Sequence, residues 1–371
     1  MRRFFKTAEG STAQLIQLCA GYFFFYIVTG ITVKYFTDVR AGFPAMHDME
    51  FLVYSTVGGS VICLGVAIGL RWYRLKSNAT MALGRLRLPR ELLYIIPSGV
   101  CTAVIIPTTT LNYMLLPSVM VAMVITRGSV IVISRAVDAI QIAQGILKKR
   151  VYWEENIAVV FALCAVGVNI FWSTNKSDRP SLFESAPAMI NLGAYVIAYM
   201  VRIYIMNYYK NTRGRGVPLD NKGFFALEQI AASFAMVAIG LAFFNATSWF
   251  GVEARPVAVF RAAIETPKPD WTGAVLAGSA YGMVAFFSVF IFMFKGRTAT
   301  FAGLVNRLTS LVAGTAATLA YWVFWGGKAP KTEDWVALGF ILVAVGFLTR
   351  AEKKRTAEMV AAHEIGDKDD E

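Results

Sequence analysis

The chain has 371 residues, of which 56% are hydrophobic and 16% are charged, and its formal net charge is +12. A soluble domain carries about 25% charged residues, so this composition excludes an ordinary soluble protein and predicts one dissolved in lipid. The positive charge lies mostly in short loops between apolar stretches, which is a membrane-topology signal and argues against a nucleic-acid partner.

Apolar stretches of about 20 residues, the length that crosses a bilayer, recur along the whole chain. The sequence therefore predicts an all-α membrane protein with ten transmembrane helices. Their expected ranges are 12–36, 51–72, 91–113, 117–140, 155–172, 186–209, 224–246, 271–294, 298–325 and 335–350. The first range follows a basic start and is interpreted as a retained helix. The charged tail 351–371 is predicted to form a frayed helix.

Lysine and arginine indicate the orientation. With an inside N-terminus, the inner loops and tails carry more than twice as many Lys and Arg residues as the outer loops. Both termini are therefore predicted to be cytoplasmic. The richness in Ala, Arg and Val favours a bacterial inner membrane, and a eukaryotic organelle membrane is the alternative.

Enzyme and cofactor signatures are missing from the sequence. The four cysteines (Cys19, Cys63, Cys101 and Cys164) each lie in an apolar stretch without a Cys or His partner, so neither a disulfide framework nor a metal site is expected. No Walker loop and no Ser/His/Asp set is found. We therefore expect no catalytic residue, no metal and no cofactor, and we do not expect an enzyme.

An internal repeat relates the two halves of the chain. Residues 121–127 and 301–307 both end in an arginine, and each leads into an apolar span, a charged loop with a tryptophan and a last span. The repeat predicts a first half at 1–172, a second at 173–350 and a cytoplasmic tail at 351–371. Because five helices make each half, the second half would enter the membrane from the opposite side, as in many secondary transporters.

The repeated segments carry a resemblance to a known family. Val124-Ile125-Thr126-Arg127-Gly128-Ser129-Val130-Ile131-Val132, continued to Phe171, and Gly303–Leu348 resemble the drug/metabolite transporter superfamily with EamA-type repeats, and the first also resembles nucleotide-sugar-type carriers. The family's Gly-Glu-Arg loop before the fifth helix is replaced here by a Lys148-Lys149-Arg150 loop. The resemblance implies ten helices in two inverted repeats, with the fourth and ninth helices lining a central substrate cavity.

Two arginines are the leading candidates for a substrate site. Arg127 and Arg307 lie about ten residues into their spans, about 15 Å deep, where a charge needs a cavity or a partner. A guanidinium binds carboxylate or phosphate in a bidentate manner. The alternative is structural, with each arginine capping carbonyls or pairing with an acid. Thr126 and Asn306 flank the arginines, and Tyr195, Tyr199 and Tyr281 are further cavity candidates.

Other intramembrane charges suggest ion pairs or gates. Arg135 and Asp138 have the spacing of a pair on one helical face, and Asp138 could instead serve as an inner gate. Arg202 and Glu228 are expected to form a salt bridge, with a coupling-proton role for Glu228 as the alternative. The aromatic run 22–26 points around the whole helix and is interpreted as lipid-facing or packing surface.

Two small-residue spacings, Gly65 with Gly69 and Gly278 with Gly282, are typical of close helix contacts. The function predicted from all these features is secondary transport or exchange of a small anionic or zwitterionic metabolite by alternating access. The alternative is a transport-inactive membrane scaffold or accessory subunit of a larger assembly. The expected partners are a small-molecule solute and the lipid bilayer, and a homodimer stays open.

Overall fold

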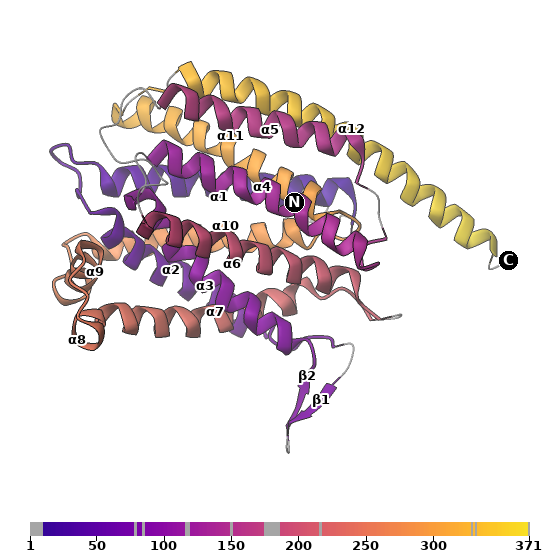
Figure 1. The fold of residues 1–371 in the computed structure, drawn as a ribbon, viewed down its shortest axis with the longest axis horizontal. Helices are drawn as coiled ribbons and strands as arrows, with labels where there is room; N and C mark the ends of the chain where they lie inside the picture. Colours follow the sequence, from indigo (N-terminus) through magenta and orange to yellow (C-terminus); the bar gives the residue numbers. More distant parts are fainter. Residues whose placement is uncertain are drawn as a thin grey trace.

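Long helices form almost the whole of the protein (Figure 1). The computed structural model describes residues 10–77, 80–83, 86–115, 119–148, 151–173, 186–214, 217–327, 329–330 and 332–369. The long helices are α1 (Thr12–Thr37), α2 (Asp48–Gly69), α3 (Leu92–Leu115), α4 (Val119–Ala143), α5 (Trp153–Ser173), α6 (Ala186–Asn211), α7 (Asn221–Phe244), α10 (Trp271–Phe292), α11 (Ala299–Trp325) and α12 (Thr332–Asp369). Each one overlaps a range predicted from the sequence.

Within the residues that the structure describes, eight of these helices are long and apolar enough to cross a membrane, namely α1, α2, α3, α6, α7, α10, α11 and α12. The chain is therefore an integral membrane protein with a helical membrane domain. Helices α4 and α5 lie outside this set of eight, and α4 carries the charged residues Arg127, Arg135 and Asp138. Ten spans in two inverted halves stay a prediction.

Three smaller elements lie between the long helices. Strands β1 (Thr80–Leu83) and β2 (Leu86–Pro89) pair antiparallel, with Met81 opposite Leu88, and this hairpin projects from the helical body (Figure 1). The predicted all-α class is confirmed, and the hairpin is a small addition to it. The expected outer loop 247–270 holds the short helices α8 (Ala246–Phe250) and α9 (Arg255–Glu265).

Side chains at the helix starts explain where several helices begin. Ser11 accepts a hydrogen bond from the backbone N–H of Gln14 at 3.2 Å, and Thr298 accepts from that of Phe301 at 3.1 Å. At the start of α2, His47 and Glu50 form a reciprocal capping box. Such caps satisfy backbone donors that the first turn of a helix leaves free. Helix α12 has no break near residue 350, so the predicted tail continues the last helix and projects beyond the body (Figure 1).

Backbone contact holds α2 against α10. A Cβ atom added at Gly58 would lie 1.8 Å from the carbonyl oxygen of Val275, and one added at Gly278 would lie 2.1 Å from that of Ser55. Gly282 approaches α2 in the same way, so the spacing of Gly278 and Gly282 marks a close helix contact as predicted. The prediction is wrong for Gly65 and Gly69, because a Cβ at either position would meet no atom within 4 Å.

The packing of the helices shows a twofold correspondence between the first five long helices and the last five. In it, α1 corresponds to α6, α2 to α7, α3 to α10, α4 to α11 and α5 to α12. Helix α2 packs on α10 as α3 packs on α7, and α1 packs on α10 as α6 packs on α3. Helix α1 also packs on α11 as α6 packs on α4, while α4 lies against α11 and α5 against α12. In Figure 1, α5 and α12 run side by side along one edge of the molecule.

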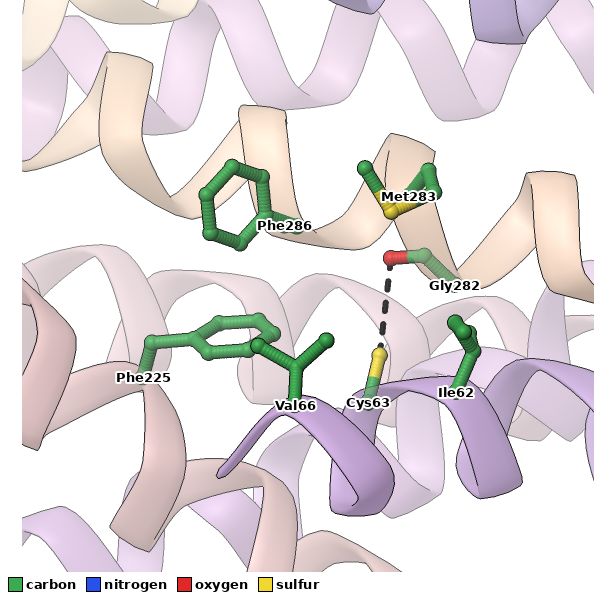
Figure 2. A pocket seen from close by; sticks show the side chains of 7 residues that line it. All are labelled: Ile62, Cys63, Val66, Phe225, Gly282, Met283 and Phe286. Atoms are coloured by element: carbon green, nitrogen blue, oxygen red, sulfur yellow. Dashed lines mark hydrogen bonds between the residues drawn. The ribbon is translucent and has the colours of Figure 1, made fainter. Parts of the chain in front are cut away.

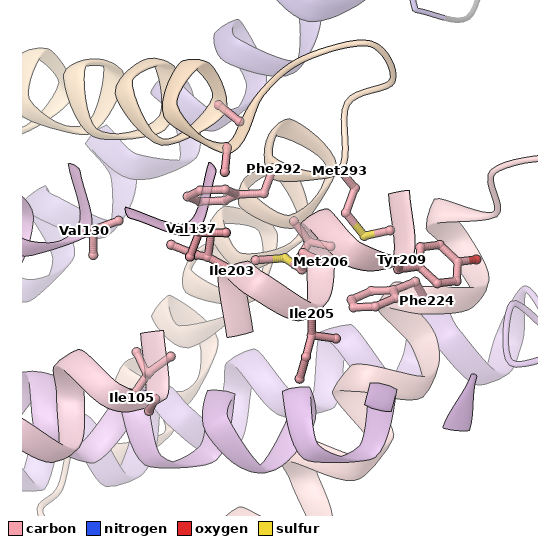
Figure 3. Close-up of a cluster of buried hydrophobic side chains, with 14 of the residues drawn as sticks. Ile105, Val130, Val137, Ile203, Ile205, Met206, Tyr209, Phe224, Phe292 and Met293 are labelled. Carbon is pink, nitrogen blue, oxygen red and sulfur yellow. The ribbon is translucent and has the colours of Figure 1, made fainter. Parts of the chain in front are cut away.

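A buried apolar cluster joins several of the long helices (Figure 3). It includes Ile105 of α3, Val130 of α4, Ile203 of α6, Phe224 of α7 and Phe292 of α10. Each of these side chains is at most 6% exposed. Close-packed interiors of this kind transmit displacements between helices, so the cluster fixes α4 and α6 relative to one another.

Candidate functional site

Arg307 of α11 is buried among phenol rings. Its guanidinium carbon lies 5.2 Å from the centre of the Tyr199 ring on α6, within cation–π range. Tyr22 of α1 and Tyr195 of α6 are its other phenolic neighbours. The Nε atom of Arg307 has no hydrogen-bond partner although its residue is only 9% exposed. This arginine is therefore held in place by rings and keeps a donor unused.

Arg127 of α4 occupies a matching environment beside Tyr26 of α1. Its Nη2 atom donates to the hydroxyl oxygen of Tyr26 on α1 at 3.4 Å. The same guanidinium lies over Gly314 of α11, where an added Cβ would be 3.7 Å from Nη2. Arg127 is partly exposed, unlike Arg307. A side chain as small as alanine at this position would still make only ordinary van der Waals contact with the guanidinium.

The two environments correspond position by position. Tyr22 and Tyr26 on α1 are four residues apart, as are Tyr195 and Tyr199 on α6. Their ring centres are 5.5 Å and 4.8 Å apart. We define the tyrosine–arginine site by its six side chains, which are Tyr22, Tyr26, Arg127, Tyr195, Tyr199 and Arg307.

The polar residues beside the arginines make corresponding contacts in the two halves. Tyr22 donates to the Oδ1 atom of Asn306 at 3.4 Å, and Tyr195 donates to the backbone oxygen of Thr126 at 3.1 Å. Asn306 also donates to the Oγ atom of Ser288 at 3.0 Å. The backbone oxygen of Thr126 and the side chain of Asn306 thus hold the tyrosines beside the arginines, and a role of either residue in substrate binding stays a prediction.

Sequence reasoning missed Tyr22 and Tyr26. The sequence pattern predicts a lipid-facing or packing surface for the aromatic run 22–26, but Tyr22 is only 2% exposed and lies close to both arginines. The signal that could have found them is their spacing of four residues, which repeats that of Tyr195 and Tyr199. Tyr281 was expected in the cavity and lies at the contact of α10 with α2, where its ring faces Gly59.

Neither arginine of the site is neutralised by an acid. Among the residues that the structure describes, no carboxylate forms an ion pair with Arg127 or Arg307. Each arginine costs roughly 2.5–3.5 kcal/mol at the centre of a membrane helix on insertion scales. The phenols offset part of this cost, yet two positive charges remain. The arrangement is therefore suited to binding an anion.

The predicted salt bridge between Arg202 and Glu228 is confirmed. Arg202 Nε and Nη2 donate to the two carboxylate oxygens of Glu228 at 2.9 Å and 3.0 Å, and Ser98 adds a hydrogen bond at 2.6 Å. Glu228 is fully buried, and Arg202 is 7% exposed. This pair is neutral overall, so it adds no net charge near the site. A proton-carrying role for Glu228 stays a prediction.

The predicted pair of Arg135 with Asp138 is wrong. Arg135 donates instead to the Oδ1 atom of Asn156 on α5 at 2.9 Å. Asp138 is fully buried and accepts from the backbone N–H groups of Ala299 and Thr300 at 2.8 Å and 2.6 Å. A carboxylate is favoured at a helix start, where backbone N–H groups are free and the helix dipole is positive. Asp138 thus fastens α4 to the first turn of α11.

A buried ionic cluster continues from this point into the extension of α12. Thr298 donates to the Oε2 atom of Glu155 at 2.9 Å, and Arg355 donates to the other oxygen at 2.6 Å. Arg297 pairs with Glu352 beside them. The sequence interpretation missed this cluster, because it joins α5 and α11 to a tail that was expected to be frayed.

Opposite this cluster, at the predicted outer end, a second polar contact joins α1 to α11. Asp38 accepts from Arg40 Nη2 and from the hydroxyl of Tyr321, each at 2.6 Å. The hydrogen bonds from Arg40 and then from Tyr321 hold the pKa of Asp38 well below its usual range. Lys34 of α1 donates to Thr318 of α11 at 2.8 Å close by.

A small pocket lies apart from the tyrosine–arginine site, between α2, α7 and α10 (Figure 2). Its volume is about 10 Å³ and its lining is apolar, including Cys63, which donates a hydrogen bond to the backbone oxygen of Gly282 at 3.4 Å. A pocket of this size holds a single water molecule at most. In this conformation it is too small to hold a metabolite.

Comparison with known proteins extends to the fold only. No known protein family and no curated protein matches the sequence. The fold matches 22 chains of solved structures. One of them, described only as "Crystal structure of protein", aligns with 93% of this chain and 99% of its own at a TM-score of 0.52 and 13% identity. A likeness at this identity concerns the fold alone, and it covers nearly the full length of both chains.

Proposed function

We propose that the protein is a secondary-active transporter or exchanger for a small anionic or zwitterionic metabolite. The tyrosine–arginine site is its substrate site, with Arg127 and Arg307 as the anion-binding groups. The observation that carries this proposal is that two intramembrane guanidiniums lie among phenols, and that neither forms an ion pair with a carboxylate of the described residues. Uncompensated charge inside a membrane marks a substrate or ion pathway by default.

Membership of the drug/metabolite transporter superfamily is part of this proposal. It is supported by the resemblance of the segments around Arg127 and Arg307, and by the exchange of helix pairs between the first and last five long helices. The tyrosine and arginine contacts of the two halves also correspond, which supports membership further, because an inverted repeat would bring equivalent residues around one axis. We also propose that both termini lie in the cytoplasm of a bacterium.

Alternating access would follow from moving one five-helix half against the other. The cluster of Asp138, Glu155 and Arg355 closes the predicted cytoplasmic end, because it ties α4, α5, α11 and α12 together with buried contacts. Arg127 is partly exposed at the same time. We therefore assign this conformation to a state closed toward the cytoplasm, from which release requires Asp138 to leave the start of α11.

The alternative, a transport-inactive scaffold, would need no unpaired charge in its interior. Buried arginines with a purely structural role are normally paired, as Arg202 is with Glu228. The absence of such a pair at Arg127 and Arg307, within the described part of the chain, favours transport.

Counterflow in proteoliposomes tests the proposal. Vesicles loaded with one carboxylate or phosphate ester at a time should take up the same labelled compound, and Arg307→Gln should lose at least about tenfold in rate. Arg261→Gln is the matched control, because it removes a cation that is paired with Glu265 and is about half exposed on α9. Uptake of no compound, or equal rates in both variants, would overturn the proposed function.

A further inference from the structure

We infer that two hydrogen-bonded pairs are the gates of the tyrosine–arginine site, with Lys34 and Thr318 as the outer gate and Asp138 and Asn207 as the inner gate. This inference rests on the proposed function and names the residues that open and close the same site. It follows from the corresponding positions of the two pairs, from their places at opposite ends of the helices that carry the site, and from their unequal burial.

The two pairs occupy corresponding positions in the two halves of the chain. Lys34 of α1 donates to the Oγ1 atom of Thr318 on α11 at 2.8 Å, and Asn207 of α6 donates to the Oδ1 atom of Asp138 on α4 at 3.3 Å. On α1 and α6, the gate residue follows the second tyrosine of the site by eight residues. On α4 and α11, the gate residue follows the arginine of the site by eleven residues. The twofold correspondence of the site therefore relates the two pairs as well.

A second hydrogen bond lies beside each pair, about one turn further along α11 or α4. Tyr321 of α11 donates to Asp38, directly after α1, at 2.6 Å. Gln141 of α4 stands at the position that corresponds to Tyr321, and its Oε1 atom accepts from Asn207 at 2.7 Å. Two hydrogen bonds thus close each end, and at each end they join corresponding helices.

The pairs lie at opposite ends of the helices that carry the site. Asp138 also accepts from the backbone N–H groups of Ala299 and Thr300, so the inner gate lies at the start of α11. Thr318 lies near the other end of that helix, and Arg307 lies between these two points. Alternating access needs a closure on each side of a site, because one closure must hold while the other opens.

The inner gate is more deeply buried than the outer gate. Asp138 is 0% and Asn207 is 2% exposed, whereas Lys34 and Thr318 are half-buried. A buried polar group that loses its partner costs more free energy than one that water can reach. We therefore expect the outer gate to open first from this conformation, in agreement with its assignment to a state closed toward the cytoplasm.

Sided labelling of a cysteine in the site measures gate opening without requiring transport. Tyr26→Cys is the reporter, and a membrane-impermeant maleimide is added to sealed vesicles of right-side-out or inside-out orientation. Labelling of the same protein without Tyr26→Cys is subtracted, because Cys19, Cys101 and Cys164 are not fully buried. With both gates intact, we expect the reporter to react faster from the outside than from the inside.

Breaking each pair should raise labelling on opposite sides. Lys34→Met should raise the outside rate, and Asn207→Leu the inside rate, each by at least about threefold, because each variant removes the donor of one gate. Asn207→Leu keeps the hydrogen bonds of Asp138 to α11. Thr318→Val and Asp138→Ala break the same pairs from the other helix, in case a first variant fails to fold. The control Arg261→Gln, on α9, should leave both rates unchanged.

The outcomes separate the gates from the proposed function. Rates that stay at the wild-type value in every gate variant, or that rise on the same side for both pairs, would overturn the gates and leave anion counterflow standing. A reporter that reacts from neither side in any variant would overturn them too, because no gate would then open. Opposite shifts of the two pairs, with no counterflow of any anion, would support the two closures and overturn the proposed transport.

Discussion

Removing the carboxylate of Glu228 should cost the protein a large part of its stability. Glu228→Gln replaces a fully buried anion that accepts two hydrogen bonds from Arg202 and one from Ser98. Breaking a buried ion pair on one side leaves an unpaired charge and typically costs about 3–5 kcal/mol. The double variant Glu228→Gln/Arg202→Met removes both charges and should recover most of that loss.

The assay is equilibrium unfolding in mixed micelles, with all variants compared with wild type in a double-mutant cycle. The expected free energy of coupling between Arg202 and Glu228 exceeds about 2 kcal/mol. A Glu228→Gln variant that unfolds like wild type, or additive effects of the two substitutions, would refute the argument that this pair is a structural ion pair. Loss of pH-dependent counterflow without loss of stability would instead support the coupling-proton role.

Three further outcomes follow from single contacts. Asp138→Ala removes the acceptor for two backbone N–H groups of α11 and should lower the free energy of unfolding by about 1–2 kcal/mol, whereas no loss in mixed-micelle unfolding would contradict the capping role. Gly58→Ala should separate α2 from α10 and lower the thermal midpoint, while the control Gly65→Ala should be nearly neutral; equal midpoints for both would argue against backbone contact there. The depressed pKa of Asp38 means that its stabilising contacts are fully present above its unfolded pKa of about 4, and that they weaken as pH falls below it toward the folded pKa. The acid side of a thermal-midpoint titration should therefore be flatter in Asp38→Asn, and an unchanged profile would contradict this.

Helix positions were predictable from the sequence because the bilayer imposes a length and an apolar composition on each span. The ion pair of Arg202 with Glu228 was predictable as well, since the two residues lie on consecutive antiparallel helices at matching depth. The close contact at Gly278 and Gly282 follows from small-residue spacing, but the same spacing at Gly65 and Gly69 faces open space, because spacing alone does not tell which face of a helix is covered.

The remaining features depend on partners that the sequence does not mark. Asp138 binds backbone N–H groups at the start of α11, and every residue type except proline supplies such donors, so no side-chain pattern reveals them. Tyr22 and Tyr26 belong to an aromatic run that covers every face of α1, and only the packing of α11 and α4 selects two of its rings. The hairpin of β1 and β2 is a few residues long and lacks a distinctive strand pattern.

An experimental structure in the presence of a transported anion tests the central claim most directly. The account predicts that the anion lies at the tyrosine–arginine site, in contact with the guanidiniums of Arg127 and Arg307 and with the phenols of α1 and α6 around it. An anion bound elsewhere, or the two arginines paired with carboxylates of the protein itself, would contradict the account.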